Sequence, residues 1–318
     1  MERVADLGER AEAAGFDVVF ASSHYNNRDP FVALDRIARR TDDVALGPGV
    51  ANPYETHPVA LAARVASLEE ASGGRARFGL GAGDRSTLSN LGVDRERPLG
   101  RVLETMQVAR RLFDGERVDH EGSFVARDAG LNFADRVGSV PVYVGAQGPD
   151  MTRMAATHAD GVLYNGSHPR DVAWAADRVE EGLAQRPEER GAFDFAAYAS
   201  VSVAEDEAAA RDAARPPVAF IAAGAANPVL DRHDLDADVA AEIADHVETG
   251  RFEAAFEAVT PGMIDAFCIA GAPATVEDRV AAVLEHADSL VVGAPLGPDP
   301  ERAMELAGSI SRDSGSRR

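Results

Sequence analysis

The 318-residue sequence contains one cysteine and no lysine, so all 32 of its basic residues are arginines. A single cysteine, Cys268, cannot form a disulfide within the chain or supply a cysteine-based metal site, and its apolar neighbours predict a buried core residue. No apolar run approaches about 18 residues and the N-terminus is charged, so we expect neither a transmembrane span nor a signal peptide. The compartment expected by default is the cytoplasm.

The charge is strongly acidic, with 53 acidic residues against 32 basic ones and a formal net charge of −21. Such a surface repels nucleic acid and anionic membranes, so neither is expected as a partner. The acidic residues are spread along the chain and form no tail, which disfavours disorder. Two interpretations remain open. One is a salt-adapted archaeal protein whose self-repulsion is screened by a very salty cytoplasm, and the other is an acidic enzyme from a GC-rich genome.

Predicted strands alternate with predicted helices along the chain. Seven hydrophobic runs are expected to be strands, at residues 17–22, 44–53, 75–84, 140–146, 161–165, 195–203 and 289–293, and the second and third break into glycine-rich ends. Residues 115–138 could hold a small hairpin, and residues 205–287 are predicted to be mostly helical. This alternation predicts an α/β fold with a mainly parallel sheet, for which the (β/α)8 TIM barrel is the natural closed form at this length.

The strand count is one short of that barrel. The chain begins with a predicted helix at residues 2–14, where a barrel would already have placed its first strand. We therefore expect one domain over residues 1–318 that lacks the first strand, with a frayed tail at residues 311–318. Either Met1 is not the true start, or the barrel is incomplete and leaves two strand edges unpaired.

Five predicted strands end in glycine-rich or polar segments. These are Ser23-His24, Gly49–Asn52, Gly81–Asp84, Gly145–Gly148 and Asn165–His168. The carboxyl ends of parallel strands meet at one edge, and glycine lets a ligand approach the backbone there. The run 44–53 ends in a glycine-proline turn that a regular strand cannot absorb, so we expect it to form the floor of an active site.

The polar residues at these ends each have a functional and a structural interpretation. Asp84 would handle a proton or hold a cationic or amide group of a substrate, or else cap a helix. His24 would hydrogen-bond a cofactor or donate a proton, or else bond the backbone of a turn. The segment Gly145–Gly148 precedes a predicted helix, so it is either a phosphate site or a tight turn. No HExxH, CxxC or P-loop pattern is present, and we expect no metal site.

Together these motifs resemble those of the coenzyme F420-dependent 5,10-methylenetetrahydromethanopterin reductases, which belong to the bacterial-luciferase-like superfamily of TIM barrels. The resemblance covers nearly the whole chain and rests on His24–Asp29, Gly47–Tyr54, Gly73–Ala76, Gly79–Asp84, Pro141–Pro149 and Gly293–Asp299. It implies the deazaflavin coenzyme F420 as cofactor. It also implies hydride transfer to a 5,10-methylene-tetrahydropterin, of the methanopterin or folate type, in a homo-oligomer such as a dimer or tetramer.

The resemblance further implies individual roles. In the family a non-prolyl cis peptide forms a bulge behind the deazaflavin ring, and the matching bond here is Gly49–Val50. His24 matches a histidine at the polar edge of the ring and Asp84 an acidic position near the substrate, so these two are the candidate catalytic residues. The implied cofactor-binding residues are Ser23, Gly49, Val50, Ala51, Asn52, Gly145, Ala146, Gln147 and Gly148.

Two departures from the family pattern matter. Ser23 stands where the family usually has an aspartate, which weakens one expected cofactor contact. The family's first strand carries a glutamate proposed to donate a proton, and this sequence shows no such strand, which a truncated gene start would explain. The alternatives are an FMN-dependent luciferase-like monooxygenase, another F420-dependent oxidoreductase, or a barrel that binds F420 without catalysis.

Overall fold

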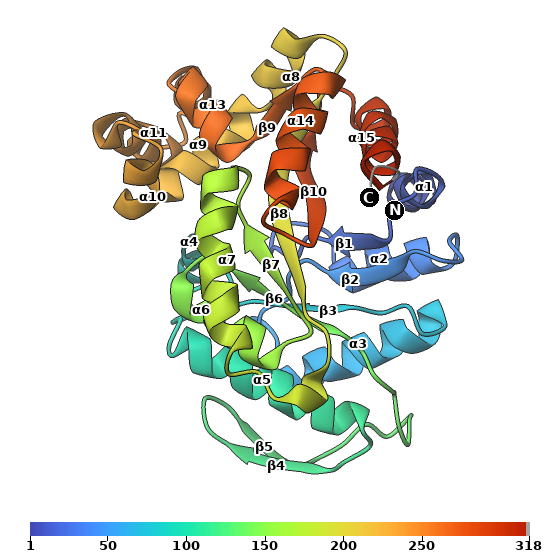
Figure 1. Cartoon of the computed structure of the whole chain (residues 1–318). Helices are drawn as coiled ribbons and strands as arrows, with labels where there is room; N and C mark the ends of the chain where they lie inside the picture. Colours follow the sequence, from blue (N-terminus) through green and yellow to red (C-terminus); the bar gives the residue numbers. More distant parts are fainter. Residues whose placement is uncertain (316–318) are drawn as a thin grey trace. The chain divides into compact units, whose positions relative to one another are not determined.

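A computed structural model describes the backbone of residues 1–315 and the side chains of residues 1–310 (Figure 1). The chain divides into two compact units. The first comprises Met1–Leu163 and Arg178–Asp194, and the second comprises Tyr164–Asp177 and Phe195–Arg318. Strand β7 (Gly161–Asn165), helix α7 (Pro169–Leu183) and strand β8 (Asp194–Val203) contribute residues to both units.

The first unit contains a run of parallel strands. They are β1 (Val18–Ala21), β2 (Ala45–Pro48), β3 (Phe78–Leu80) and β6 (Val142–Ala146). β1 pairs with β2, single bridges join the β2 segment to the β3 segment, and β3 pairs with β6. The bridge Ala51–Leu80 lies at the carboxyl side of this run. Because the strands are parallel, their carboxyl ends lie at the same edge, as the alternating pattern predicted.

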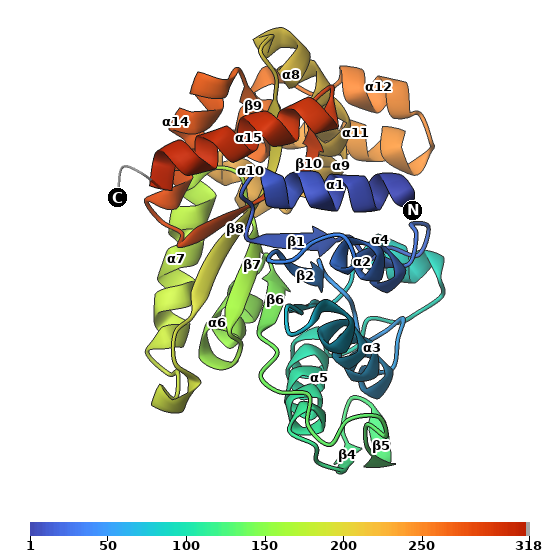
Figure 2. The same ribbon diagram turned by 90° about the vertical axis from the view of Figure 1, so that its right-hand side faces the viewer.

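Helices follow the strands of this unit and pack on one another. They are α1 (Glu2–Ala13), α2 (Pro30–Ala38), α3 (Pro58–Ser72), α4 (Arg85–Asn90), α5 (Pro98–Phe113) and α6 (Pro149–His158), with a short 3-10 turn at Glu188–Arg190. Contacts run from α1 to α2, from α2 to α3, and from α3 through α5 to α6 (Figure 2). Sequence signals explain their starts, because a proline occupies the first turn of α2, α3, α5 and α6. Asp29 also caps α2, where Oδ1 accepts the N–H of Phe31 at 2.8 Å.

The predicted hairpin is present as the antiparallel pair β4 (Val118–Glu121) and β5 (Val125–Ala129). Glu104 of α5 secures its turn, since Oε2 accepts both the N–H and the hydroxyl of Ser123 at 2.6 Å. His57, at the start of α3, lies 3.1 Å from the carbonyl oxygen of Val125 through Nε2. The hairpin is therefore tied to two helices of the first unit.

The second unit combines a parallel strand pair with a helical region. β8 pairs with β10 (Ser289–Leu296), and its last residues pair with β9 (Ile269–Gly271). The helices are α8 (Glu207–Ala213), α9 (Arg215–Gly224), α10 (Asn227–Arg232), α11 (Ala237–Glu248), α12 (Phe252–Glu257), α13 (Pro261–Phe267), α14 (Pro273–Leu284) and α15 (Pro300–Gly315). Several of them enclose a core that contains Ile243, Met263 and Cys268, and the predicted burial of Cys268 is confirmed.

All seven predicted strands are present, and the differences are local. β9 falls inside the region predicted to be helical, because its three residues are too few to show a strand period. No helix was predicted for the segment that forms α4, and α15 extends to Gly315, into the tail that was predicted to fray from residue 311. Residues 316–318 of the predicted frayed tail lie outside the described residues. The assignment of residues 1–318 to a single domain stays a prediction.

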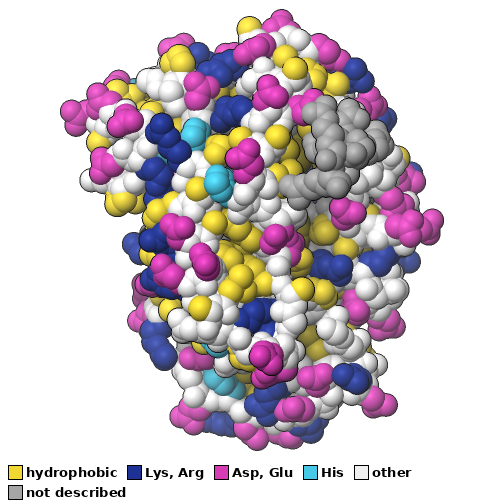
Figure 3. All heavy atoms as spheres, in the orientation of Figure 1, with side chains coloured by type: hydrophobic (Ala, Val, Ile, Leu, Met, Phe, Trp, Pro, Cys, Tyr) yellow, Lys and Arg dark blue, Asp and Glu magenta, His cyan; other side chains and the backbone are white. Residues whose placement is uncertain are grey.

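The surface matches the composition. Figure 3 shows acidic side chains scattered over one face, with arginines between them. No helix within residues 1–315 is long and apolar enough to cross a lipid bilayer.

Candidate functional site

The structure brings four of the predicted strand ends together in the first unit. Ser23 and His24 follow β1, and the segment Gly49–Asn52 follows β2. Ala82–Asp84 follows β3, and Gly145–Gly148 joins the end of β6 to α6. The fifth end, Asn165–His168, belongs to the second unit, where Ser167 Oγ accepts the N–H of Ser200 at 3.0 Å.

The segment after β2 contains the predicted cis peptide bond between Gly49 and Val50, which is confirmed. The Val50 side chain lies directly against neighbouring glycines. A Cβ built on Gly81 would lie 2.5 Å from Val50 Cγ2, and one on Gly145 would lie 3.1 Å from the same atom. A Cβ on Gly79 would lie 1.9 Å from the carbonyl oxygen of Pro48. These glycines therefore make room for the β2 segment, and they present no side chain at this edge.

Asn52 holds the turn that follows. Its side chain is buried, with 5% of the residue exposed. Oδ1 accepts the N–H groups of Tyr54 and Glu55 at 3.1 and 3.0 Å, and Nδ2 donates to Glu55 Oε1 at 2.8 Å. The Arg101 guanidinium donates to the carbonyl oxygen of Pro53 from both Nε and Nη2. The polar atoms of Asn52 thus bond within the turn, which fixes the backbone that a ligand would meet.

His24 lies half-buried beside a cavity of about 250 Å³. Residues 23–25, 27–31, 51–52, 55–56, 61 and 64 contribute to its lining, and these include the predicted site residues Ser23, His24, Ala51 and Asn52. The His24 ring stacks on Tyr25 with 4.7 Å between ring centroids. Nδ1 lies 2.5 Å from Asn26 Oδ1, and Nε2 lies 2.8 Å from Thr87 Oγ1. The ring is therefore fixed in orientation, with both nitrogens in hydrogen-bond contact.

Asp84 is the N-cap of α4, which was the structural alternative predicted for it. Oδ1 accepts the N–H of Thr87 at 2.9 Å and the hydroxyl of Ser86 at 2.5 Å. Burial alone would raise the pKa of Asp84, but the hydrogen bonds from Ser86 and Thr87 outweigh it and hold this pKa below its ordinary value. Asp84 is consequently a carboxylate at neutral pH, suited to accept hydrogen bonds from a ligand and unsuited to donate a proton.

The end of β6 leads directly into the amino end of α6. Gly148 is the N-cap and makes no side-chain cap, and a Cβ placed on it would meet no atom within 4 Å. Peptide N–H groups in the first turn of a helix attract anions. Asp150 adds a negative charge to that turn, although Arg153 pairs with it at 2.7 Å. Ala146 is buried, whereas Gln147 and Gly148 are exposed.

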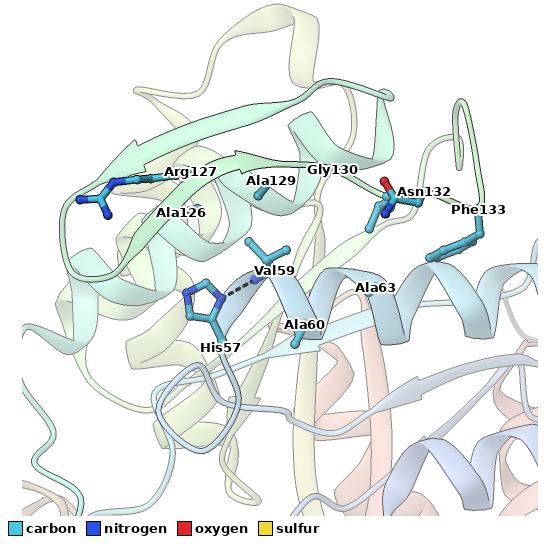
Figure 4. Close-up of a pocket in the computed structure, with 11 residues that line it drawn as sticks. His57, Val59, Ala60, Ala63, Ala126, Arg127, Ala129, Gly130, Asn132 and Phe133 are labelled. Carbon is cyan, nitrogen blue, oxygen red and sulfur yellow. Dashed lines mark hydrogen bonds between the residues drawn. The ribbon is translucent and has the colours of Figure 1, made fainter.

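A larger cavity of about 530 Å³ lies between α3 and the β4–β5 hairpin (Figure 4). Val59, Ala60 and Ala63 of α3 line one side, while Ala126 and Phe133 belong to the hairpin and the segment after it. None of the predicted site residues lines it. Small and apolar residues make up most of its lining, and His57, Arg127 and Asn132 are its polar members.

Within the part of the chain that the structure describes, no group of three or more His, Cys, Asp or Glu side chains is arranged to hold a metal ion.

Comparison with known proteins identifies the family. A luciferase-like monooxygenase family model matches residues 1–288. The chain is 41% identical to the 5,10-methylenetetrahydromethanopterin reductase of Archaeoglobus fulgidus, over 94% of this chain and 91% of the relative. It is 38% identical to the reductase of Methanolobus tindarius, over 96% and 94% of the two chains. The coenzyme F420-dependent tetrahydromethanopterin reductase of Methanopyrus kandleri has a solved structure that matches with a TM-score of 0.90 and 36% identity, over 96% of this chain and 93% of the other.

The chain belongs to the luciferase-like 5,10-methylenetetrahydromethanopterin reductase family. Membership confirms the predicted luciferase-like TIM-barrel fold class. The structure also gives the candidate site two features that sequence reasoning missed, namely Thr87 between His24 and Asp84 and the Arg101 anchor of the turn after β2. A signal for Thr87 exists in the sequence, since an N-cap aspartate bonds the residue three positions later. Arg101 has no comparable local signal, because its partner lies far away along the chain.

Proposed function

We propose that this member of the reductase family transfers a hydride from reduced coenzyme F420 to a 5,10-methylene-tetrahydropterin, giving the 5-methyl form. The observation that carries the proposal is its near full-length similarity to reductases named for this reaction. When bound, the reduced deazaflavin supplies the hydride. The chain's own residues then have to hold two ligands, fix their orientation and manage protons.

The residues present fit a flat, anionic cofactor. Val50 fills the Cβ side of Gly81 and Gly145, and Ala51 and Ala146 add only methyl groups, so these strand ends carry small apolar side chains, which suit the face of a planar ring. The uncapped amino end of α6 at Gly148 offers peptide N–H groups to a phosphate. We assign the ring to the first set and the phosphate to the second.

Distinct roles follow for the two candidate catalytic residues. His24 lines the cavity with Ser23 and Ala51, and its two ring nitrogens contact Asn26 and Thr87, so it would bond the polar edge of the cofactor ring by exchanging one of these contacts. Asp84 is ionised, so it would accept N–H groups of the pterin and stabilise positive charge that develops there. Neither Ser23 nor Asp84 would act as a proton donor in this scheme.

We further propose a salt-rich cytoplasm as the working environment and a homo-oligomer as the working form. The net charge of −21 supports the first, because screening by salt removes the self-repulsion of an acidic surface. Family membership supports the second. The carrier of the one-carbon unit is a tetrahydropterin of the methanopterin or folate type.

The decisive experiment follows anaerobic oxidation of F420H2 by the purified protein at molar salt. Methylene-tetrahydromethanopterin and methylene-tetrahydrofolate are supplied in parallel reactions, and reduced FMN replaces F420H2 in a control. We expect turnover with at least one of the two pterins and none with FMN. Binding of F420 without turnover of either pterin would refute the proposal and support a non-catalytic barrel.

A further inference from the structure

Two arginines without a carboxylate partner line the cavity beside His24. Arg28 precedes α2 and Arg64 belongs to α3, and both contribute to the lining of this cavity of about 250 Å³. Among residues 1–310, neither guanidinium group forms an ion pair with Asp or Glu. Arg39 and Arg40, which follow α2, behave differently, since they pair with carboxylates at 3.0 and 2.7 Å. Two unpaired guanidinium groups at one cavity favour an anionic ligand group.

Packing holds Arg64 at the edge of the cavity. Its guanidinium carbon lies 5.8 Å from the centre of the Phe31 ring, an arrangement in which the ring face attracts the cation. Leu61 lies one turn earlier on α3 and lines the same cavity, so the i, i+3 spacing places both side chains on the face of α3 that borders it. A guanidinium group over a ring face keeps its N–H edge available, and that edge can bind a carboxylate through two hydrogen bonds.

Two carboxylates also line the cavity, and both are bonded within their own loops. Asp29 Oδ1 accepts two peptide N–H groups in the first turn of α2, at 2.8 and 3.1 Å. Glu55 Oε1 accepts a hydrogen bond from Asn52 Nδ2 at 2.8 Å. Because their negative charges remain, the cavity carries both signs of charge. It therefore suits a group that combines carboxylates with an amide N–H, as a glutamyl residue does.

We propose that this cavity binds a glutamyl residue in the tail of a ligand, and that Arg28 and Arg64 hold its carboxylates. With about 250 Å³, the cavity is smaller than the roughly 300–1,000 Å³ typical of whole small-molecule sites, so it suits one end of a ligand. The identity of the ligand rests on the proposed function, because F420 and a folate-type pterin both carry glutamyl residues. The binding of carboxylates by two arginines is a property of the protein alone.

The test measures the Kd of ligands with and without a glutamyl residue, by calorimetry at one fixed molar concentration of KCl. The pterin series compares 5-methyl-tetrahydrofolate with 5-methyl-tetrahydropteroate, and the coenzyme series compares F420 with and without its glutamyl tail. The variants are Arg28→Gln, Arg64→Gln and the double variant. Arg36→Gln is the matched control, because it removes the same charge from an exposed position of α2 that does not line the cavity.

We expect the glutamyl residue to tighten binding to the wild type about tenfold in at least one series, as hydrogen bonds between charged groups would. Each single variant should lose part of this factor, the double variant should lose all of it, and Arg36→Gln should keep it. The series that shows the factor identifies the ligand. Equal affinities within both wild-type series, an unchanged factor in the double variant, or the same loss in Arg36→Gln would overturn the proposal.

Turnover of F420H2 separates this proposal from the proposed function. If the wild type shows the tenfold factor but reduces neither methylene-pterin, the glutamyl site stands and the proposed function fails. If it reduces a pterin but binds ligands equally well with and without a glutamyl residue, the proposed function stands and the glutamyl site fails.

Discussion

Asp84 combines a helix cap with a negative charge, and two substitutions separate these roles. Asp84→Asn keeps a side-chain oxygen for the N–H of Thr87 and the hydroxyl of Ser86, whereas Asp84→Ala removes it. Asparagine and aspartate are equally good N-caps, and replacement of either by alanine costs about 1 kcal/mol. We therefore expect the free energy of unfolding to fall by about 1 kcal/mol in Asp84→Ala and by only a few tenths in Asp84→Asn.

The difference in the free energy of unfolding between wild type and Asp84→Ala should depend on pH, in a direction that follows from the pKa of Asp84. Because the folded-state pKa of Asp84 is lowered, its carboxylate stabilises the fold above the ordinary aspartate pKa, and this contribution is lost as pH falls through the folded-state value. Urea unfolding at fixed molar KCl, at neutral pH and near pH 3, measures it. The gap between wild type and Asp84→Ala should narrow at the lower pH.

Turnover of F420H2 gives the second readout for the same pair. If the charge of Asp84 acts on the pterin, both variants lose activity by about tenfold or more, although only Asp84→Ala is destabilised. Full activity in Asp84→Asn would refute the role of the charge and leave Asp84 as a cap. Equal stability of the two variants would refute the cap.

Three further predictions follow from the structure. Gly81→Ala places a Cβ 2.5 Å from Val50 Cγ2, so we expect the free energy of unfolding in urea to fall by about 1–3 kcal/mol. Gly148→Ala is the matched control, because its Cβ meets nothing within 4 Å. Burial, with nearby positive charge, lowers the pKa of His168 to about 4. The unfolded chain therefore binds the proton at a higher pH than the folded protein, and the free energy of unfolding falls as pH drops from about 6.5 toward 4. After a discount for solvent screening we expect a loss of about 1–2 kcal/mol, which His168→Gln removes. Raising KCl from about 0.1 to 1 M shortens the Debye length from about 10 to 3 Å. Repulsion within this chain of net charge −21 is then screened, so unfolding should require more urea. An unchanged urea midpoint would contradict the salt-adapted interpretation.

The sequence predicted the buried strands, because their residue pattern is local. Buried parallel strands are short hydrophobic runs with turn residues at both ends, and all seven runs form strands. Asp84 illustrates the limit, since its side chain caps α4 while its position at a strand end also suits a ligand. Local pattern favoured neither interpretation, and only the bond distances and the lowered pKa show that the carboxylate caps the helix and remains charged.

Contacts between residues that are distant in the sequence could not be predicted from local residue patterns. Thr87 meets His24 because α4 places its third residue beside the end of β1, a relation that no spacing along the chain encodes. The Arg101 guanidinium likewise reaches the carbonyl oxygen of Pro53 from a helix that begins forty-odd positions later. In both cases the role of the residue depends on a partner that is distant in the sequence. Only the folded structure shows that the two partners lie together.

The glycines at the strand ends were predicted to be part of the site, but the structure gives a different reason for their lack of a side chain. Gly81 and Gly145 were interpreted as openings for a ligand, but their missing Cβ atoms are required by Val50 of the neighbouring segment. Loss of activity in a Gly81→Ala variant would therefore report displacement of Val50 before any loss of a cofactor contact. Gly148 is different, because open space surrounds its Cβ position at the amino end of α6. Among these glycines it is the one whose substitution tests the phosphate site without disturbing the packing of the strands.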